Sequence, residues 1–166
     1  YEHKKRIYKF ISTIDVDNAY VYKHKSIVRS VGGLFKDIYK LNIFGVWERL
    51  AVLFNFKKDH FNTFSEILKS KKDFNIRTIF FFLVADYTSY DTNTSVAKNK
   101  FRLLIKEMVD YARVGLHPSY YTMKDTSLLK REKERLEIIT HIPTIRSRQH
   151  YLRFSIPSTY QNLIDL

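Results

Sequence analysis

The chain has 166 residues and a mass of 19.9 kDa, and its 45% hydrophobic and 28% charged residues suffice for one domain with a buried core. Its formal net charge is +12, from 29 Lys and Arg against 17 Asp and Glu, which favours nucleic acid or an anionic surface as a partner. Cysteine is absent, which excludes disulfides, thiolate metal sites, iron–sulfur clusters and a cysteine nucleophile. Any metal must therefore bind to histidine and carboxylate side chains.

The first half of the chain predicts one strand followed by three helices. β-Branched and aromatic residues predict a strand from Arg6 to Ile14. Between Tyr20 and Phe56 apolar residues recur at helical intervals, and we expect a helical insertion there, made of two short helices that separate near Asn42. A further helix is expected after Asn62 and Thr63, either of which can cap it, and it ends in the basic run Lys69 to Lys72.

The second half continues the alternation of strand and helix patterns. The expected elements are a buried strand from Arg77 to Ala85, a helix from Val96 to Ala112, a short strand from Val114 to Leu116, a helix from Ser127 to Thr140, a strand from Arg146 to Phe154, and a helix opened by Pro157. This order predicts an α/β fold of parallel βα units. Four such units amount to half of an eight-fold barrel, whose usual length is ~250 residues.

Neither a membrane span nor a leader is visible. The longest apolar stretch, Ile76 to Ala85, is much shorter than the ~20 residues that a membrane helix needs. The chain opens on Tyr1 without Met or an apolar leader, and it stops at Leu166 early in an expected helix. We therefore expect part of a longer protein, and the lack of a visible leader or span favours a cytoplasmic location.

Polar residues follow the first predicted strand at the point where sites form in parallel α/β folds. Asp15 and Asp17 are two residues apart, so both carboxylates point to one face if the strand continues. Two neighbouring carboxylates can divide the work of a proton acceptor and a metal ligand. An Asp-rich turn that includes Asn18 is the alternative interpretation.

Histidines follow the later strands. His117 comes directly after the strand ending at Leu116, and Arg148 and His150 share one face of the last predicted strand. An edge strand with solvated polar residues is the alternative interpretation of that segment. One Asp and two His suit zinc or a similar divalent ion with a position left for water. No role is assigned to the other histidines, which are His3, His24, His60 and His141.

Four strings in this order carry a family resemblance: TIDVDNAY (13–20), IFFFL (79–83), GLHPSY (115–120) and SRQHYLRF (147–154). Together they resemble the bacterial polysaccharide deacetylases of the NodB-homology type, and more narrowly a divergent branch with a D-x-D first motif. The resemblance implies a distorted (β/α) barrel, or its N-terminal part, with the helical insertion at about residues 20–56 as an addition. Residues 1–166 would form a single, incomplete deacetylase-like domain.

The resemblance also implies roles for particular residues. Asp15 would be the catalytic base, and Asp17 and His117 would be metal ligands. His150 is expected as the third ligand from its strand face. Arg148 would orient the base, as the family's third-motif arginine does; Arg153, together with Pro157, is an alternative for that motif.

Two tyrosines and the C-terminal end mark departures from the family pattern. Tyr121 stands where the family usually has its second histidine, and we expect Tyr120 and Tyr121 to bind substrate. The family's later motifs, including its general-acid histidine, would lie beyond Leu166. A chain of this kind can bind a metal and yet lack a complete catalytic set.

The leading hypothesis is therefore an enzyme: metal-dependent hydrolysis of N-acetyl groups on sugars of a bacterial polysaccharide or its precursor. Zinc is the expected cofactor, with cobalt or nickel as alternatives, and an N-acetylated carbohydrate is the expected partner. One alternative is a sugar-binding or assembly module that has lost turnover. Another is a nucleic-acid-binding protein. It ranks lower because most aromatic residues recur at the spacing of core-facing positions, and no nucleic-acid-binding motif is present. The basic, aromatic helices between Ile27 and Phe54 are candidates for peripheral contact with a membrane, or for a cover over the site.

Overall fold

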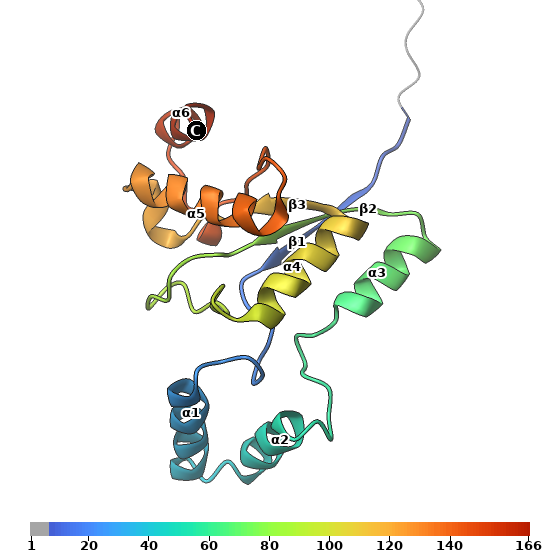
Figure 1. Ribbon diagram of the computed structural model, residues 1–166, viewed down its shortest axis with the longest axis vertical. Helices are drawn as coiled ribbons and strands as arrows, with labels where there is room; N and C mark the ends of the chain where they lie inside the picture. Colours follow the sequence, from blue (N-terminus) through green and yellow to red (C-terminus); the bar gives the residue numbers. More distant parts are fainter. Residues whose placement is uncertain (1–6) are drawn as a thin grey trace, which may run out of the picture.

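The computed structural model describes residues 7–166, so His3 and the predicted strand start at Arg6 lie outside the described residues. A parallel sheet forms its centre, with the strands in the order β1 (Ile11–Val16), β2 (Arg77–Phe82) and β3 (Arg113–Leu116) (Figure 1). Because the strands are parallel, their carboxyl ends meet at one edge. The prediction of an α/β fold with parallel strands is confirmed.

Six α-helices accompany the sheet in the described part of the chain. They are α1 (Ile27–Tyr39), α2 (Ile43–Leu53), α3 (Phe64–Asp73), α4 (Asn99–Tyr111), α5 (Thr126–Thr140) and α6 (Ser158–Ile164), with two 3₁₀-helices, η1 (Tyr120–Met123) and η2 (His150–Leu152). The predicted helical insertion contains α1 and α2, and Asn42 separates them by capping α2 through the N–H of Gly45. None of the helices between residues 7 and 166 has the length and apolar character to cross a bilayer.

The core lies between the sheet and the helices α3 and α4. Phe80 and Phe82 of β2 are fully buried on this face, where Phe80 packs against Phe64 of α3 and Phe82 packs edge-on against Phe101 of α4. α5 adds Leu129, Leu136 and Ile139 to the same cluster. Aromatic side chains of this size contribute a large part of the hydrophobic stabilisation, since each buries 150–250 Å². The continuous apolar run of β2 thus reflects a strand that is buried on both faces.

The register of the strands aligns the residues that precede the site. Val16, Phe82 and Leu116 lie opposite one another in adjacent strands. The hydrogen-bond ladder continues past them, because the N–H of Leu83 donates to the carbonyl of Val16 (3.2 Å) and the N–H of His117 donates to that of Phe82 (2.9 Å). Asp17 and His117 therefore each stand one residue beyond the same row of the sheet.

The prediction of a fourth strand from Arg146 to Phe154 is wrong. Only Ser147 pairs with β3, through an isolated parallel bridge to Leu116, after which the chain turns into η2. The next position along β3 after His117 is Pro118, which has no N–H to continue a ladder. The N–H of His150 instead donates to the carbonyl of Pro118 (3.1 Å), and Tyr151 takes a left-handed conformation with φ of 58°.

Gly115 lets this turn lie close to the sheet. A Cβ atom on Gly115 would stand 2.7 Å from the ring of Phe81 and 2.8 Å from the carbonyl oxygen of Arg146. Both distances are too short for any side chain. The segment that carries Arg148 and His150 can therefore reach the carboxyl edge only because residue 115 has no side chain.

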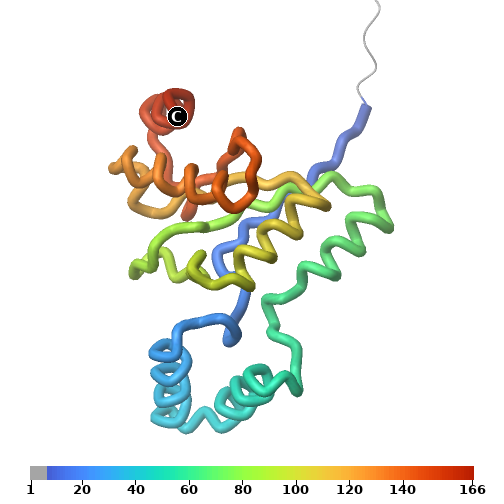
Figure 2. The backbone as a smooth tube through the Cα atoms, in the orientation of Figure 1, coloured from blue at the N-terminus to red at the C-terminus, as the bar shows by residue number. Residues whose placement is uncertain are grey.

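The chain leaves the body of the protein through the α1–α2 pair and returns to it, as the backbone in Figure 2 shows. The two ends of this excursion meet at one buried carboxylate. Asp59 is only 2% exposed, and its oxygens accept hydrogen bonds from the backbone N–H groups of Val21, Tyr22, Lys23 and Phe61. Burial alone would raise the pKa of Asp59, but these four donors together hold it below its ordinary value. Asp59 thus fastens the two ends of the helical excursion to each other.

Replacement of this carboxylate is expected to weaken the fold. In Asp59→Asn an amide nitrogen would meet the N–H groups of Tyr22 and Lys23, both of which now donate to Oδ2. Two lost charge-assisted bonds predict a decrease of about 3 kcal/mol in the free energy of unfolding, measured by urea denaturation. Asp110→Asn, at an exposed position of α4, is the matched control and should change little. Equal stability of the two variants would contradict the role of Asp59.

Candidate metal centre

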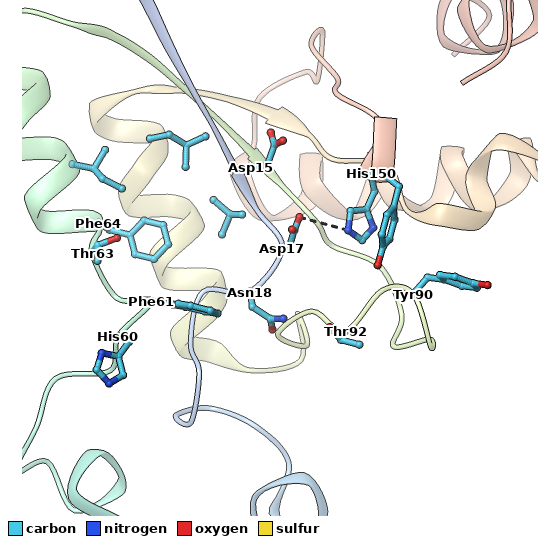
Figure 3. Close-up of a pocket in the computed structure, with 14 residues that line it drawn as sticks. Asp15, Asp17, Asn18, His60, Phe61, Thr63, Phe64, Tyr90, Thr92 and His150 are labelled. Atoms are coloured by element: carbon cyan, nitrogen blue, oxygen red, sulfur yellow. Dashed lines mark ion pairs between the residues drawn. The ribbon is translucent and has the colours of Figure 1, made fainter. Parts of the chain in front are cut away.

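Four side chains predicted from the sequence meet at the carboxyl edge of the sheet. Asp15 lies near the end of β1, Asp17 just after it, His117 just after β3, and His150 in η2. Figure 3 shows Asp15, Asp17 and His150 around one pocket. Segments that are far apart in the sequence thus bring one carboxylate and two imidazoles together beside a second carboxylate.

The donor atoms have the spacing that a divalent ion requires. Asp17 Oδ1 lies 3.1 Å from His117 Nε2 and 3.7 Å from His150 Nε2, and one ligand atom from each of the three residues lies within 4.8 Å of the others. A tetrahedral zinc site with bonds of ~2.1 Å places its ligand atoms ~3.4 Å apart. The three side chains therefore fit one divalent ion with small side-chain movements. The side chain of Asp17 is 53% exposed, so solvent from the pocket would have access to an ion held by these residues.

Both histidines direct Nε2 at Asp17 because Nδ1 is engaged elsewhere. His117 Nδ1 donates to the carbonyl of Arg148, and His150 Nδ1 lies 2.8 Å from Asp91 Oδ1. In the neutral imidazole the proton then sits on Nδ1, and Nε2 presents a lone pair. When His117 is protonated, its Nε2–H donates to Asp17 and lowers the pKa of that carboxyl.

Asp91 is a site residue that the sequence did not reveal. It lies in the loop between β2 and α4, is fully buried, and accepts hydrogen bonds from His150 Nδ1, from the N–H of Tyr120 (2.9 Å) and from Thr88 Oγ1 (2.9 Å). A carboxylate behind a metal-binding histidine fixes its tautomer and ring orientation. In the sequence this acid stands in a polar, turn-like stretch from Asp86 to Ser95, which gives no indication of its burial.

Arg148 reaches Asp15 although residues 146–154 do not form the predicted strand. Its Nη1 donates to Asp15 Oδ1 (3.1 Å), its Nη2 donates to Thr13 Oγ1 (2.6 Å), and its guanidinium lies over the ring of Phe81 at 5.0 Å. These contacts hold the carboxylate of Asp15 beside the donor cluster. The other arginine that the sequence offered, Arg153, instead covers the ring of Tyr120 at 3.9 Å.

The pocket at this edge has a volume of about 570 Å³. Asp15 and Asp17 lie on its floor, and Phe61, Phe64 and Tyr90 also line it (Figure 3). Phe61 precedes α3 and Phe64 begins it. Tyr151, a further lining residue, lies against His150 with ring centroids 4.4 Å apart. His60, to which the sequence assigned no role, also lines it and lies 2.8 Å from Glu48. Aromatic rings therefore stand on two sides of the acidic floor.

Four tyrosine rings form a cluster beside His150. Tyr90 stacks on Tyr120 with ring centroids 3.9 Å apart, and Tyr121 and Tyr151 contact this pair edge-on. Of the four, Tyr90 and Tyr151 line the pocket, whereas Tyr120 and Tyr121 pack against them in η1. The expected substrate contact of Tyr120 and Tyr121 stays a prediction.

A second buried carboxylate supports the loop that carries His117. Glu132 of α5 is fully buried, and its Oε2 accepts the N–H of Ser119 (3.0 Å), while Oε1 has no hydrogen-bond partner among the described residues. Burial raises the pKa of Glu132 to about 7. Its proton is therefore held at a pH at which an exposed glutamate is ionised.

Comparisons of the chain with protein-family models, with curated proteins and with solved structures find no match in any of the three.

The buried Glu132 is expected to make stability depend on pH. Its pKa rises from 4.5 in the unfolded chain to about 7 in the folded one, so between these values only the folded state binds the proton. Stability then decreases as pH rises, by about 3 kcal/mol in total. In urea titrations Glu132→Gln should match the wild type at about pH 5 and exceed it at about pH 8.

Glu134→Gln, at an exposed position of the same helix, is the control and should retain the wild-type pH profile. A pH profile of Glu132→Gln that parallels the wild type would contradict the raised pKa.

Proposed function

We propose that the chain hydrolyses N-acetyl groups on the sugars of a bacterial polysaccharide or its precursor, with a divalent metal ion, zinc in the first place, at Asp17, His117 and His150. One observation carries this proposal: three ligand atoms converge beside a separate carboxylate, Asp15, on the floor of an open pocket. The resemblance of the sequence motifs to NodB-type deacetylases points to the same chemistry. It also supports a (β/α) barrel of that type as the proposed architecture, with which the parallel sheet is compatible.

The residues of the chain divide the chemical work. A divalent ion, when bound, lowers the pKa of a coordinated water and polarises the amide carbonyl. Asp15 lies outside the ligand set and accepts the proton of the attacking water. Arg148 holds the Asp15 carboxylate in place, and Asp91 keeps the Nε2 of His150 directed at the ligand cluster.

The pocket walls suit a carbohydrate. Phe61 on one side and Tyr90 and Tyr151 on the other present aromatic rings, and the carboxylates of the floor accept hydrogen bonds from hydroxyl groups. The apolar C–H face of a pyranose ring packs against such aromatic surfaces. Both kinds of contact would place an acetamido group over the donor cluster.

A sugar-binding module without turnover is the second candidate function. Tyr121 at the family's second histidine position and the ring cluster around Tyr90 favour it. Such a module would bind N-acetylglucosamine oligomers and release no acetate with any metal. An acetate assay run beside a binding assay separates the two functions.

We expect acetate release from N-acetylglucosamine oligomers when zinc, cobalt or nickel is added, and its loss with a chelator. Asp15→Asn should lower the rate by ~10²–10⁴-fold because it removes the general base, while zinc binding persists. Asp17→Asn should lose both activity and zinc. Asp110→Asn, far from the pocket in sequence and exposed on α4, is the control. Metal-independent activity, or full activity in Asp15→Asn, would rule out the mechanism.

Asp91→Asn should weaken zinc binding by ~10–100-fold, because the amide no longer fixes His150 as the carboxylate does. Competition with a chromophoric chelator measures this affinity. Asp86→Asn, in the same loop but 61% exposed, is the matched control and should bind zinc as the wild type does. Equal affinities in the two variants would show that Asp91 does not position the ligand.

A further inference from the structure

The α1–α2 pair, residues 27–53, turns its apolar side chains to solvent. No residue of α1 is buried. Six large apolar side chains of the pair, which we call the outer face, are 67–82% exposed: Ile27, Val28, Phe35, Ile43, Phe44 and Trp47. An amphipathic helix normally places this stripe against a core. The pair therefore exposes the surface that ordinary helices bury.

Polar contacts on the opposite side fix this orientation. Arg29 donates to the carbonyls of Asn93 (3.2 Å) and Thr92 (3.3 Å), which attaches α1 to the loop that carries Asp91. Between the helices Arg49 pairs with Asp37 at 2.7 Å. Rotation of the apolar stripe of α1 toward the body would break the Arg29 contacts and the Arg49–Asp37 pair and would leave buried charge unpaired.

The charge around the outer face is positive. Residues 20–61 contain eight Lys and Arg against three Asp and Glu. All three acids are engaged: Asp37 with Arg49, Glu48 with Lys57 (2.8 Å), and Asp59 with backbone donors. Within residues 27–53 the exposed charged side chains are Lys36 and Lys40, both positive.

From these observations we propose that the outer face of α1–α2 docks on an anionic lipid surface. Apolar and aromatic side chains on one side of a helix, with basic residues on the other, are the pattern of helices that lie in the membrane interface. A second copy of the chain is a poorer occupant, because it would bring another +12 of net charge to the contact. The pair also projects from the body at the carboxyl edge, where a flat surface can reach it (Figures 1 and 2).

The fluorescence of Trp47 can report binding, because Trp47 is the only tryptophan in the chain and is 69% exposed on the outer face. With vesicles of phosphatidylcholine and phosphatidylglycerol, its emission should shift to the blue and the chain should co-sediment, and added salt should weaken both effects. Vesicles of phosphatidylcholine alone should bind much less. The double variant Phe35→Ser, Phe44→Ser should bind the anionic vesicles at least roughly tenfold more weakly.

Ile138→Ser, at a 65% exposed position of α5, is the matched control and should bind as the wild type does. Lys36→Glu together with Lys40→Glu tests the charge with the apolar face intact, and should also lower binding to anionic vesicles. Because these positions are exposed, thermal unfolding should be unchanged; if the double Phe variant fails to fold, Ile27→Ser with Ile43→Ser replaces it.

Three results would overturn the proposal: no binding to anionic vesicles, equal binding to neutral ones, or unchanged binding by the apolar variants. A concentration-dependent dimer without lipid, abolished by Phe35→Ser with Phe44→Ser, would also overturn it and assign the face to a second copy. The vesicle assay needs neither metal nor substrate, so its outcome is independent of the proposed hydrolysis.

Discussion

The site depends first on the parallel register of the sheet. Val16, Phe82 and Leu116 share one row, and the backbone ladder extends one residue further on β2, at Leu83, and on β3, at His117. Adjacent strands lie ~4.8 Å apart, so Asp17 and His117 face each other across one intervening strand, a gap that an aspartate and a histidine can close. A slip of one residue in β1 would direct Asp17 to the opposite face. Val16 is buried in the core and Ile14 packs against the same cluster, so a slip of β1 would expose apolar surface. Core packing thus sets the positions of the candidate ligands.

Two buried acidic side chains support the candidate ligands. Asp91 joins the loop after β2 to His150 and to the backbone of Tyr120, and Glu132 joins α5 to the backbone of Ser119. Both therefore act on the short segment that follows His117. Removing either acid would leave a buried backbone N–H, that of Tyr120 or of Ser119, without its partner, so the two acids hold this irregular segment in place.

Sequence patterns predicted where the strands end, and with them the positions of Asp15, Asp17 and His117. The polar residues that follow parallel strands gather at one edge of the sheet. His150 and Arg148 were predicted at the site for the wrong reason, since the strand proposed for them ends after one bridge at Ser147. The position of Pro118 indicates that β3 ends there, but the sequence does not show that the neighbouring segment then turns toward Asp17. Asp91 was missed because its partners, Thr88 apart, come from segments distant in the sequence, and no local pattern distinguishes a buried carboxylate from one in a solvated turn. The helices of the insertion were predicted correctly, but the direction of their apolar faces depends on Arg29 and Arg49, whose contacts are tertiary.

Gly115 has no functional group, yet the distance between the two imidazoles depends on it. The ring of Phe81 and the carbonyl of Arg146 leave room for one hydrogen atom at that position. A single methyl group there would push the 146–150 segment outward and carry His150 away from Asp17, with every ligand still present in the sequence. Tolerance to substitution at position 115 therefore measures how much displacement the candidate metal centre can absorb.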